Sequence, residues 1–292
     1  MRRQIIVVFF SLFLGAALPA LAVDRGALFK VSGAGHTMLL FGTMHVGQPD
    51  FYPLEPRIAQ AVAHASTLAL EVDPLMPPEV VAKAVREYGM AAPGAALPPA
   101  LAARLARTLG KAGLDPAALA PLKPWMVAMV LGVSEYARLG YRTDLAVDAH
   151  LAGLARAAKV KVLELESIDA QMALFGSLSD ADQLRYLDDS LALIESGKQR
   201  AEVRQVVDAW SSADRAALDA LAARVDQDTT YAGRFVRDVL LDGRNGGLAD
   251  KLMLLLARED NAVAAIGVLH LLGKHSVPAL LRAKGVTVER VY

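Results

Sequence analysis

Two Gly-x-x-His segments lie near opposite ends of this 292-residue chain. The first is Gly42-Thr43-Met44-His45 and the second is Gly267-Val268-Leu269-His270. Each one ends an apolar run, and a further glycine follows shortly after the histidine. One such segment arises often by chance. Two copies separated by most of the chain predict a single site that is assembled from both ends of the fold.

Two carboxylates, Glu71 and Glu166, also stand at the ends of apolar segments. In open α/β sheets, ligands bind beyond the carboxyl ends of the strands. Four strands would therefore bring two imidazoles and two carboxylates to one edge of the sheet. These ligand types suit a divalent ion such as Mn²⁺, Co²⁺ or Zn²⁺. Gly42 and Gly267 would leave room for a ligand at that edge.

The elements that must position these residues indicate an α/β fold with a mixed, largely parallel central sheet. Apolar runs around the glycine-rich segment 32–35 predict an N-terminal β-hairpin. The strand–helix–strand order that follows is typical of a βαβ unit and predicts a parallel pair. The expected strands are 27–31, 36–41, 67–73, 161–166, 263–267 and 286–291.

Two long helical insertions, at about 75–160 and 168–256, are expected to cover the C-terminal edge of the strands. Several prolines stand where a helix would begin, a position that tolerates proline. We expect residues 23–292 to form a single domain with these insertions. The expected helices include 57–65, 78–88, 99–109, 116–120, 124–139, 145–158 and 277–283.

The composition excludes several classes of function. Basic and acidic residues both number 31 and aromatic residues make up 6%, so neither charge nor stacking points to nucleic acid. The absence of cysteine excludes disulfides, thiolate metal sites and a cysteine nucleophile. Gly-x-Ser-x-Gly, His-Glu-x-x-His and P-loop motifs are absent from the sequence. The other histidines, His36, His64, His150 and His275, are expected to be structural or solvated.

Residues 1–22 have the pattern of a secretory signal peptide. Arg2 and Arg3 precede an apolar run, and Ala20-Leu21-Ala22 matches a cleavage site. The sequence therefore predicts a periplasmic or secreted protein that has no membrane attachment after cleavage. An uncleaved membrane anchor is the alternative, although the apolar run is short for a span of about 20 residues.

The combination of motifs resembles the TraB/PrgY/GumN family, whose relatives include the Tiki proteases. More distantly, the chain is similar to the erythromycin esterase and ChaN-like superfamily. Ser167 and Lys274-His275-Ser276 depart from the usual pattern of the family. The matching segments are 41–47, 70–73, 122–125, 147–148, 163–166 with Gln171, 244–245 and 267–273.

The resemblance implies a metal-dependent hydrolase in which His45, His270 and Glu71 form the metal site. It also implies Arg244, Asp148 and Glu166 as further pocket residues. We expect peptide-bond cleavage through a metal-activated water, with a peptide or small molecule as the substrate. Glu71 would accept the water's proton, or would bind the metal while Glu166 accepts the proton. Arg244 would stabilise the oxyanion or orient a substrate carboxylate.

Three alternatives remain open from the sequence. The first is a metal-independent esterase with a histidine as the general base, which the erythromycin esterase resemblance suggests. The second is a periplasmic haem-binding or metal-binding protein without catalysis, as the ChaN-like relatives suggest. The third is a binder of signalling peptides or polysaccharide-pathway components that has lost catalysis.

Overall fold

The computed structural model describes residues 23–292, so the expected signal peptide lies outside the described residues. Its central element is one six-stranded sheet with the strand order β4-β3-β5-β2-β1-β6. The four strands from β4 to β2 are mutually parallel, while β1 pairs antiparallel with both β2 and β6. The expected mixed, largely parallel sheet with an N-terminal hairpin is therefore confirmed. The strands are Leu28–Gly33 (β1), His36–Thr43 (β2), Thr67–Leu70 (β3), Lys161–Glu164 (β4), Ala262–Gly267 (β5) and Thr287–Arg290 (β6).

The pairing inside the sheet differs from the sequence prediction in one respect. Strands β2 and β3 are parallel but do not pair, because β5 lies between them. The residues of β5 are almost entirely buried and apolar, which suits a central strand that is covered on both faces. This insertion of a C-terminal strand between two N-terminal strands places the two Gly-x-x-His segments side by side.

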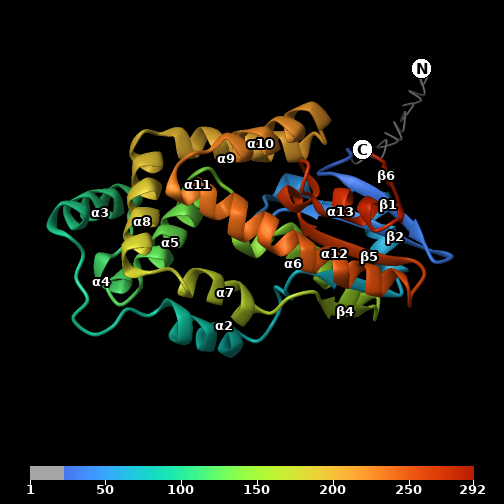
Figure 1. The fold of residues 1–292 in the computed structure, drawn as a ribbon, viewed down its shortest axis with the longest axis horizontal. Coiled ribbons are helices and arrows are strands. Elements are labelled where there is room, and N and C mark those ends of the chain that lie inside the picture. Colours follow the sequence, from blue (N-terminus) through green and yellow to red (C-terminus); the bar gives the residue numbers. More distant parts are fainter. Residues whose placement is uncertain (1–22) are drawn as a thin grey trace, which may run out of the picture.

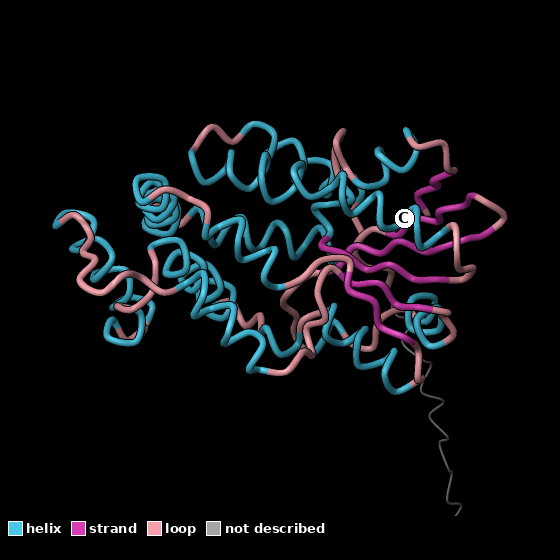
Figure 2. The backbone as a smooth tube through the Cα atoms, turned by 60° about the horizontal axis from the view of Figure 1, so that its bottom comes forward, coloured by secondary structure: helices cyan, strands magenta, loops and turns pink. Residues whose placement is uncertain are grey.

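Helices cover both faces of the sheet and form a separate helical half beside it (Figure 1). Helix α6, against which α1 packs, lies on one face, and α12 and α13 lie on the other. Figure 2 shows the strands gathered at one end of the molecule. The helices are Pro56–Ala63 (α1), Pro78–Ala84 (α2), Pro99–Ala112 (α3), Pro116–Leu119 (α4), Pro124–Arg138 (α5), Val147–Ala157 (α6), Ile168–Gly176 (α7), Asp180–Glu195 (α8), Lys198–Ser211 (α9), Arg215–Gln227 (α10), Tyr231–Phe235 (α11), Gly243–Leu256 (α12) and Val277–Ala283 (α13), with π-helical segments Val85–Gly89 and Val236–Asp242.

The main core encloses the sheet, and two smaller cores lie within the helical half. Both tryptophans are fully buried, Trp210 in the main core and Trp125 in a smaller one. The indole Nε1–H of Trp210 donates to the carbonyl oxygen of Gly42 at 2.8 Å. This bond ties the end of α9 to the strand that precedes His45. Within residues 23–292, the structure contains no helix long and apolar enough to span a membrane.

Glu55 is a buried carboxylate whose ionisation is expected to reduce stability. Only 2% of Glu55 is exposed, and the hydroxyl of Tyr292 donates to its Oε1. Burial raises the pKa of Glu55 and outweighs this hydrogen bond. A raised pKa in the folded state gives stability below the unfolded-state pKa that is lost as the pH rises. Glu55→Gln should therefore stabilise the protein at neutral pH.

The measurement is urea denaturation of Glu55→Gln and wild type across the acidic to neutral pH range. The free energy of unfolding of the variant should exceed that of wild type by an amount that grows as the pH rises. If the variant exceeded wild type in free energy of unfolding by the same amount at every pH, ionisation of Glu55 would not destabilise the folded state.

Candidate functional site

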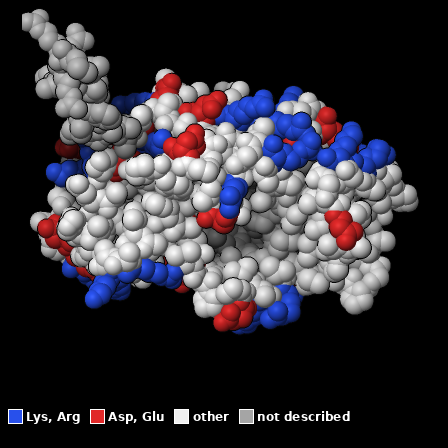
Figure 3. Space-filling model, turned by 180° about the vertical axis from the view of Figure 1, so that it is seen from behind, with Lys and Arg blue, Asp and Glu red and all other residues white. Residues whose placement is uncertain are grey.

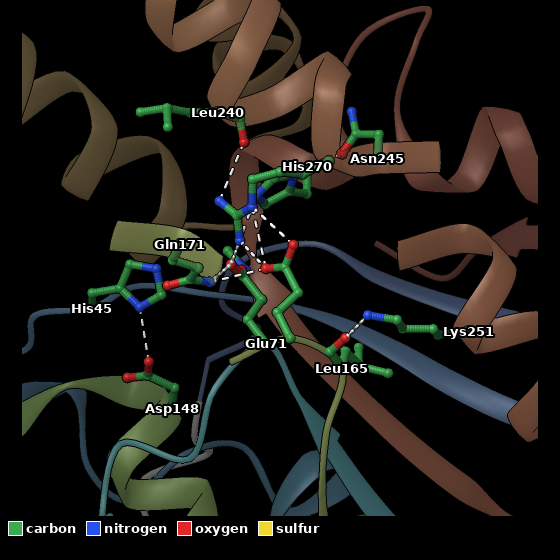
Figure 4. Close-up of polar contacts among 12 residues, drawn as sticks. His45, Glu71, Asp148, Leu165, Gln171, Leu240, Asn245, Lys251 and His270 are labelled. Carbon is green, nitrogen blue, oxygen red and sulfur yellow. Dashed lines mark hydrogen bonds and ion pairs between the residues drawn. The ribbon is translucent and has the colours of Figure 1, made fainter. Parts of the chain in front are cut away.

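Four of the residues singled out in the sequence lie together beyond the carboxyl ends of the parallel strands. Figure 4 shows three of them, His45, Glu71 and His270. His45 follows β2, Glu71 follows β3, and His270 follows β5. Glu166 comes two residues after β4 ends, so the predicted strand 161–166 is shorter than expected. The backbone pairing of Glu166 with Glu71 nevertheless continues, since the Glu166 N–H donates to the Glu71 carbonyl at 2.7 Å.

Glu71 is the central acceptor of the site. Only 6% of the residue is exposed. The backbone N–H of Gly267 donates to its Oε1 at 2.6 Å, and the Arg244 guanidinium forms an ion pair with its Oε2. Burial opposes ionisation, but nearby positive charge and the Gly267 bond lower the pKa of Glu71 to about 2. His270 contributes to this lowering only when it is protonated, whereas the Arg244 charge acts throughout the working pH range.

Arg244 joins the two carboxylates of the site. Its Nε donates to Glu166 Oε1 at 3.1 Å, and its Nη2 contacts both Glu71 and Glu166. Its Nη1 donates to the carbonyl oxygen of Leu240 at 3.2 Å. The side-chain amide of Gln171 donates to Glu166 at 2.9 Å. All three guanidinium nitrogens therefore already donate to protein oxygens.

His45 is the more solvent-exposed of the two histidines. Its Nδ1 lies 2.8 Å from Asp148 Oδ2, and 66% of its side chain is exposed. Partial removal from water lowers the pKa of His45, but the Asp148 bond and the charges of Asp148 and Glu71 raise it to about 9. The net shift of the His45 pKa is upward because of the contact with Asp148. A side chain as exposed as this one loses little hydration, so the opposing effect of burial on the pKa is small. Nδ1 is engaged, so Nε2 is left for the pocket.

His270 is the buried member of the pair. Only 5% of its side chain is exposed, and its Nδ1 lies 2.6 Å from Asn245 Oδ1. Burial lowers the pKa of His270 to about 4, although the Glu71 charge opposes this shift. The imidazole is therefore neutral near pH 7. Its Nε2 lies 3.8 Å from Glu71 Oε2.

Gly267 leaves open the space around which these groups gather. A Cβ atom at Gly267 would lie 3.2 Å from Glu71 Oε1, 3.6 Å from His45 Nε2 and 3.7 Å from His270 Cδ2. Gly42 is needed for close packing instead, because a Cβ atom there would lie 2.8 Å from the Val268 side chain. The glycine of the second motif is thus the one that borders the ligand groups.

The donor types suit a divalent cation. Each histidine has its Nδ1 held by an oxygen acceptor, which is the usual support of a metal-ligating imidazole. An ionised carboxylate, Glu71, lies beside them. Among residues 23–292, however, no three His, Asp or Glu side chains already stand at the spacing of a metal site.

A pocket of about 170 Å³ opens beside these groups. Its lining includes the polar residues His45, Glu71 and Asp148 and the apolar residues Leu70, Val72 and Pro74. Figure 3 shows a hollow between the sheet half and the helical half, with walls mainly free of Lys, Arg, Asp and Glu. The full lining is Thr43, His45, Leu70, Glu71, Val72, Pro74, Asp148, Gln171 and Ala265.

Sequence reasoning assigned no role to Gln171 or Asn245. Both occurred only within segments that carry the family resemblance. Neither amide has a charge or a motif of its own that signals a site. Asn245 follows Arg244 on α12, and Gln171 lies on α7 four residues after the N-cap Ser167. Only the fold shows that their side chains contact Glu166 and His270.

Gly47 fixes the loop that leads to Asp148. It exchanges backbone hydrogen bonds with Arg142 at 2.8 and 2.9 Å, and a Cβ there would overlap the Leu145 carbonyl oxygen. Gly47→Ala is therefore expected to destabilise the protein by about 1–3 kcal/mol, as overpacking typically does. It should also displace Asp148 from His45.

Urea denaturation measures this effect, with Gly132→Ala as the matched control. Gly132 lies in α5 with no atom within 4 Å of its added Cβ. That control should gain roughly 0.5–1 kcal/mol, because alanine favours a helix over glycine. Equal stabilities of the two variants would contradict the close contact at Gly47.

The model of the TraB/PrgY/gumN family matches residues 27–290 of the chain. This chain belongs to the TraB/PrgY/gumN family. The chain is also 26% identical over 247 residues to an uncharacterized protein, YbaP, of Escherichia coli strain K12. That match covers 83% of this chain and 87% of YbaP.

The YbaP protein of Shigella flexneri matches to the same extent and is likewise described as uncharacterized. No solved structure matches the chain. The resemblance drawn from the motifs is therefore confirmed as family membership. The two relatives add no activity, so the chemistry of this TraB/PrgY/gumN member must be argued from its own residues.

Proposed function

We propose that this TraB/PrgY/gumN protein is a metal-dependent hydrolase that cleaves amide bonds in peptides or small molecules. One observation carries the proposal. Two imidazoles, each with Nδ1 held by an oxygen acceptor, lie with an ionised carboxylate around the open space at Gly267. His45, His270 and Glu71 would hold the cation, for which Mn²⁺, Co²⁺ and Zn²⁺ are the candidates.

A bound divalent ion would lower the pKa of a water molecule and polarise the carbonyl of the substrate. The contacts of Glu71 favour a ligand role over that of a base. Its lowered pKa makes it a weaker proton acceptor than an ordinary carboxylate. We therefore assign proton transfer to Glu166, the second carboxylate of the cluster.

The contacts of Arg244 support a role in holding the two carboxylates. An arginine free to bind a substrate carboxylate would have unengaged nitrogens, whereas those of Arg244 donate to Glu71, Glu166 and Leu240. The guanidinium holds both carboxylates in position and helps to keep Glu71 ionised. We accordingly propose Arg244 as a supporting residue, which leaves polarisation of the carbonyl to the cation.

The lining of the pocket favours a substrate with an uncharged group next to the cleaved bond. Leu70, Val72 and Pro74 contribute apolar residues to its lining. We further propose that the protein works in the periplasm or is secreted, which rests on the pattern of residues 1–22. Fractionation of cells that express the full chain tests this location. A full-length product in the cytoplasm would contradict it.

A metal-independent esterase is the second candidate, because the His45–Asp148 pair has the form of a general base with its orienting carboxylate. The pKa of His45, about 9, means that such a base is mostly protonated near neutral pH. Esterase activity by this route should therefore rise with pH up to about 9. It should also survive exhaustive chelation, which a metal-dependent reaction would not.

The test uses residues 23–292 purified without chelator, with metal content measured by mass spectrometry and cleavage measured on a peptide library. Wild type should carry about one divalent ion per chain and cleave peptides. Glu71→Gln should lose both properties, whereas Glu166→Gln should keep the metal and lose cleavage. Wild type that binds none of the three ions, or cleaves equally well after chelation, would overturn the proposal.

A further inference from the structure

Asn245 makes two hydrogen bonds that fix the orientation of its side chain. It lies in the first turn of α12 and is 2% exposed. Its Nδ2 donates to the backbone carbonyl of His275 at 2.9 Å. Its Oδ1 lies 2.6 Å from His270 Nδ1. One buried amide thus joins the second Gly-x-x-His motif to the loop that follows it. Figure 4 shows Asn245 beside His270.

The chemistry of these partners sets the position of the His270 proton. A backbone carbonyl only accepts hydrogen bonds, so the amide NH₂ group of Asn245 must face His275. The amide oxygen therefore faces His270, and it too can only accept. The short contact then requires a proton on Nδ1 of His270. A neutral imidazole has one proton, so Nε2 carries a lone pair on the side of Glu71.

The loop after the motif is shaped to deliver this carbonyl. Gly273 has a φ of +83°, a conformation that glycine adopts without strain. The turn there brings the His275 backbone back to α12, where Asn245 lies. The His275 side chain points elsewhere, with its Nδ1 2.7 Å from Asp242. The glycine that closes the second motif thus supports the histidine through Asn245.

We propose that Asn245 is a positioning residue that holds His270 in the Nδ1-protonated tautomer with Nε2 free to act as a ligand. The proton on Nδ1 follows from the hydrogen bonds, and the free Nε2 follows because a neutral imidazole has one proton. The consequence for metal binding rests on the proposed function. Asp148 supports His45 in the corresponding place with a carboxylate, at the exposed side of the site. A neutral amide suits the buried histidine, because an unpaired buried charge is costly.

Nitrogen-15 NMR of histidine-labelled protein tests the tautomer without metal or substrate. The His270 signals are assigned by their loss in His270→Ala. In wild type, Nδ1 should be protonated and Nε2 should not. Asn245→Ala should populate the Nε2-protonated form, because Nδ1 loses its acceptor. His275→Ala is the matched control and should change nothing at His270, since only its backbone carbonyl is used.

A proton on Nε2 in wild type, or an unchanged tautomer in Asn245→Ala, would overturn the proposal. The wild-type spectrum decides the tautomer even if the variant does not fold. The second readout is the affinity for Co²⁺, which should fall about 10–100-fold in Asn245→Ala, as for other residues that support a metal ligand. Wild type that shows the expected tautomer but binds no Co²⁺ would contradict the proposed function and leave the tautomer assignment standing.

Discussion

Alanine at His45 or at His270 is expected to remove both metal binding and hydrolysis. Each substitution removes one of the two imidazoles that lie beside Glu71. The loss of affinity should exceed the roughly 10–100-fold that follows removal of a residue supporting a ligand. Equilibrium dialysis against Mn²⁺, Co²⁺ and Zn²⁺ measures the affinity, and a peptide-cleavage assay measures hydrolysis.

His64→Ala is the matched control for these variants. Within residues 23–292, the one hydrogen-bond partner of His64 Nδ1 is the carbonyl of Gln60, in the adjoining helix. Its removal should leave metal affinity and hydrolysis unchanged. Because His270 is buried, its variant also needs a check of folding by circular dichroism. Full metal binding in folded His45→Ala and His270→Ala would rule out the assigned ligands.

Arg244→Met is expected to cause the largest loss of stability. The arginine side chain is 14% exposed and pairs with Glu71 and Glu166, which are 7% and 15% exposed. Removal of one partner of a buried ion pair leaves uncompensated charge and costs about 3–5 kcal/mol. Here two neighbouring carboxylates would lose their shared cation. The free energy of unfolding from urea denaturation is the measurement.

The pH dependence of this loss distinguishes lost charge from lost packing. The pKa of Glu71 is lowered in the folded protein, so its ionised form stabilises wild type above the unfolded-state pKa. That contribution disappears as the pH falls toward 2. The stability gap between wild type and Arg244→Met should therefore shrink in acid. The triple variant with Glu71→Gln and Glu166→Gln should also recover much of the lost stability, whereas a gap independent of pH would indicate lost packing.

Most elements of the fold could be predicted from hydrophobic periodicity and from prolines at helix starts. All six expected strands are present, and the helix predicted at 277–283 matches α13. The order of the strands could not be predicted. Pairing of β5 between β2 and β3 depends on contacts between residues far apart in the sequence. No local pattern records such contacts.

The same limit explains what the sequence showed of the site. The two histidines and Glu71 were found because charged or polar residues at the ends of apolar strands are conspicuous. Asn245 and Gln171 lie on helices, and their types are common on exposed helix faces. Their contacts with His270 and Glu166 arise only when α12 and α7 pack beside the strand ends. Supporting residues of this kind require the three-dimensional structure.

The most direct test of the proposed metal site is anomalous diffraction from crystals of residues 23–292 grown with Mn²⁺, Co²⁺ or Zn²⁺. We expect one strong peak per chain beside Gly267, within bonding distance of His45, His270 and Glu71. A peak bound elsewhere, or no peak with any of the three ions, would contradict a metal-dependent reaction at this site.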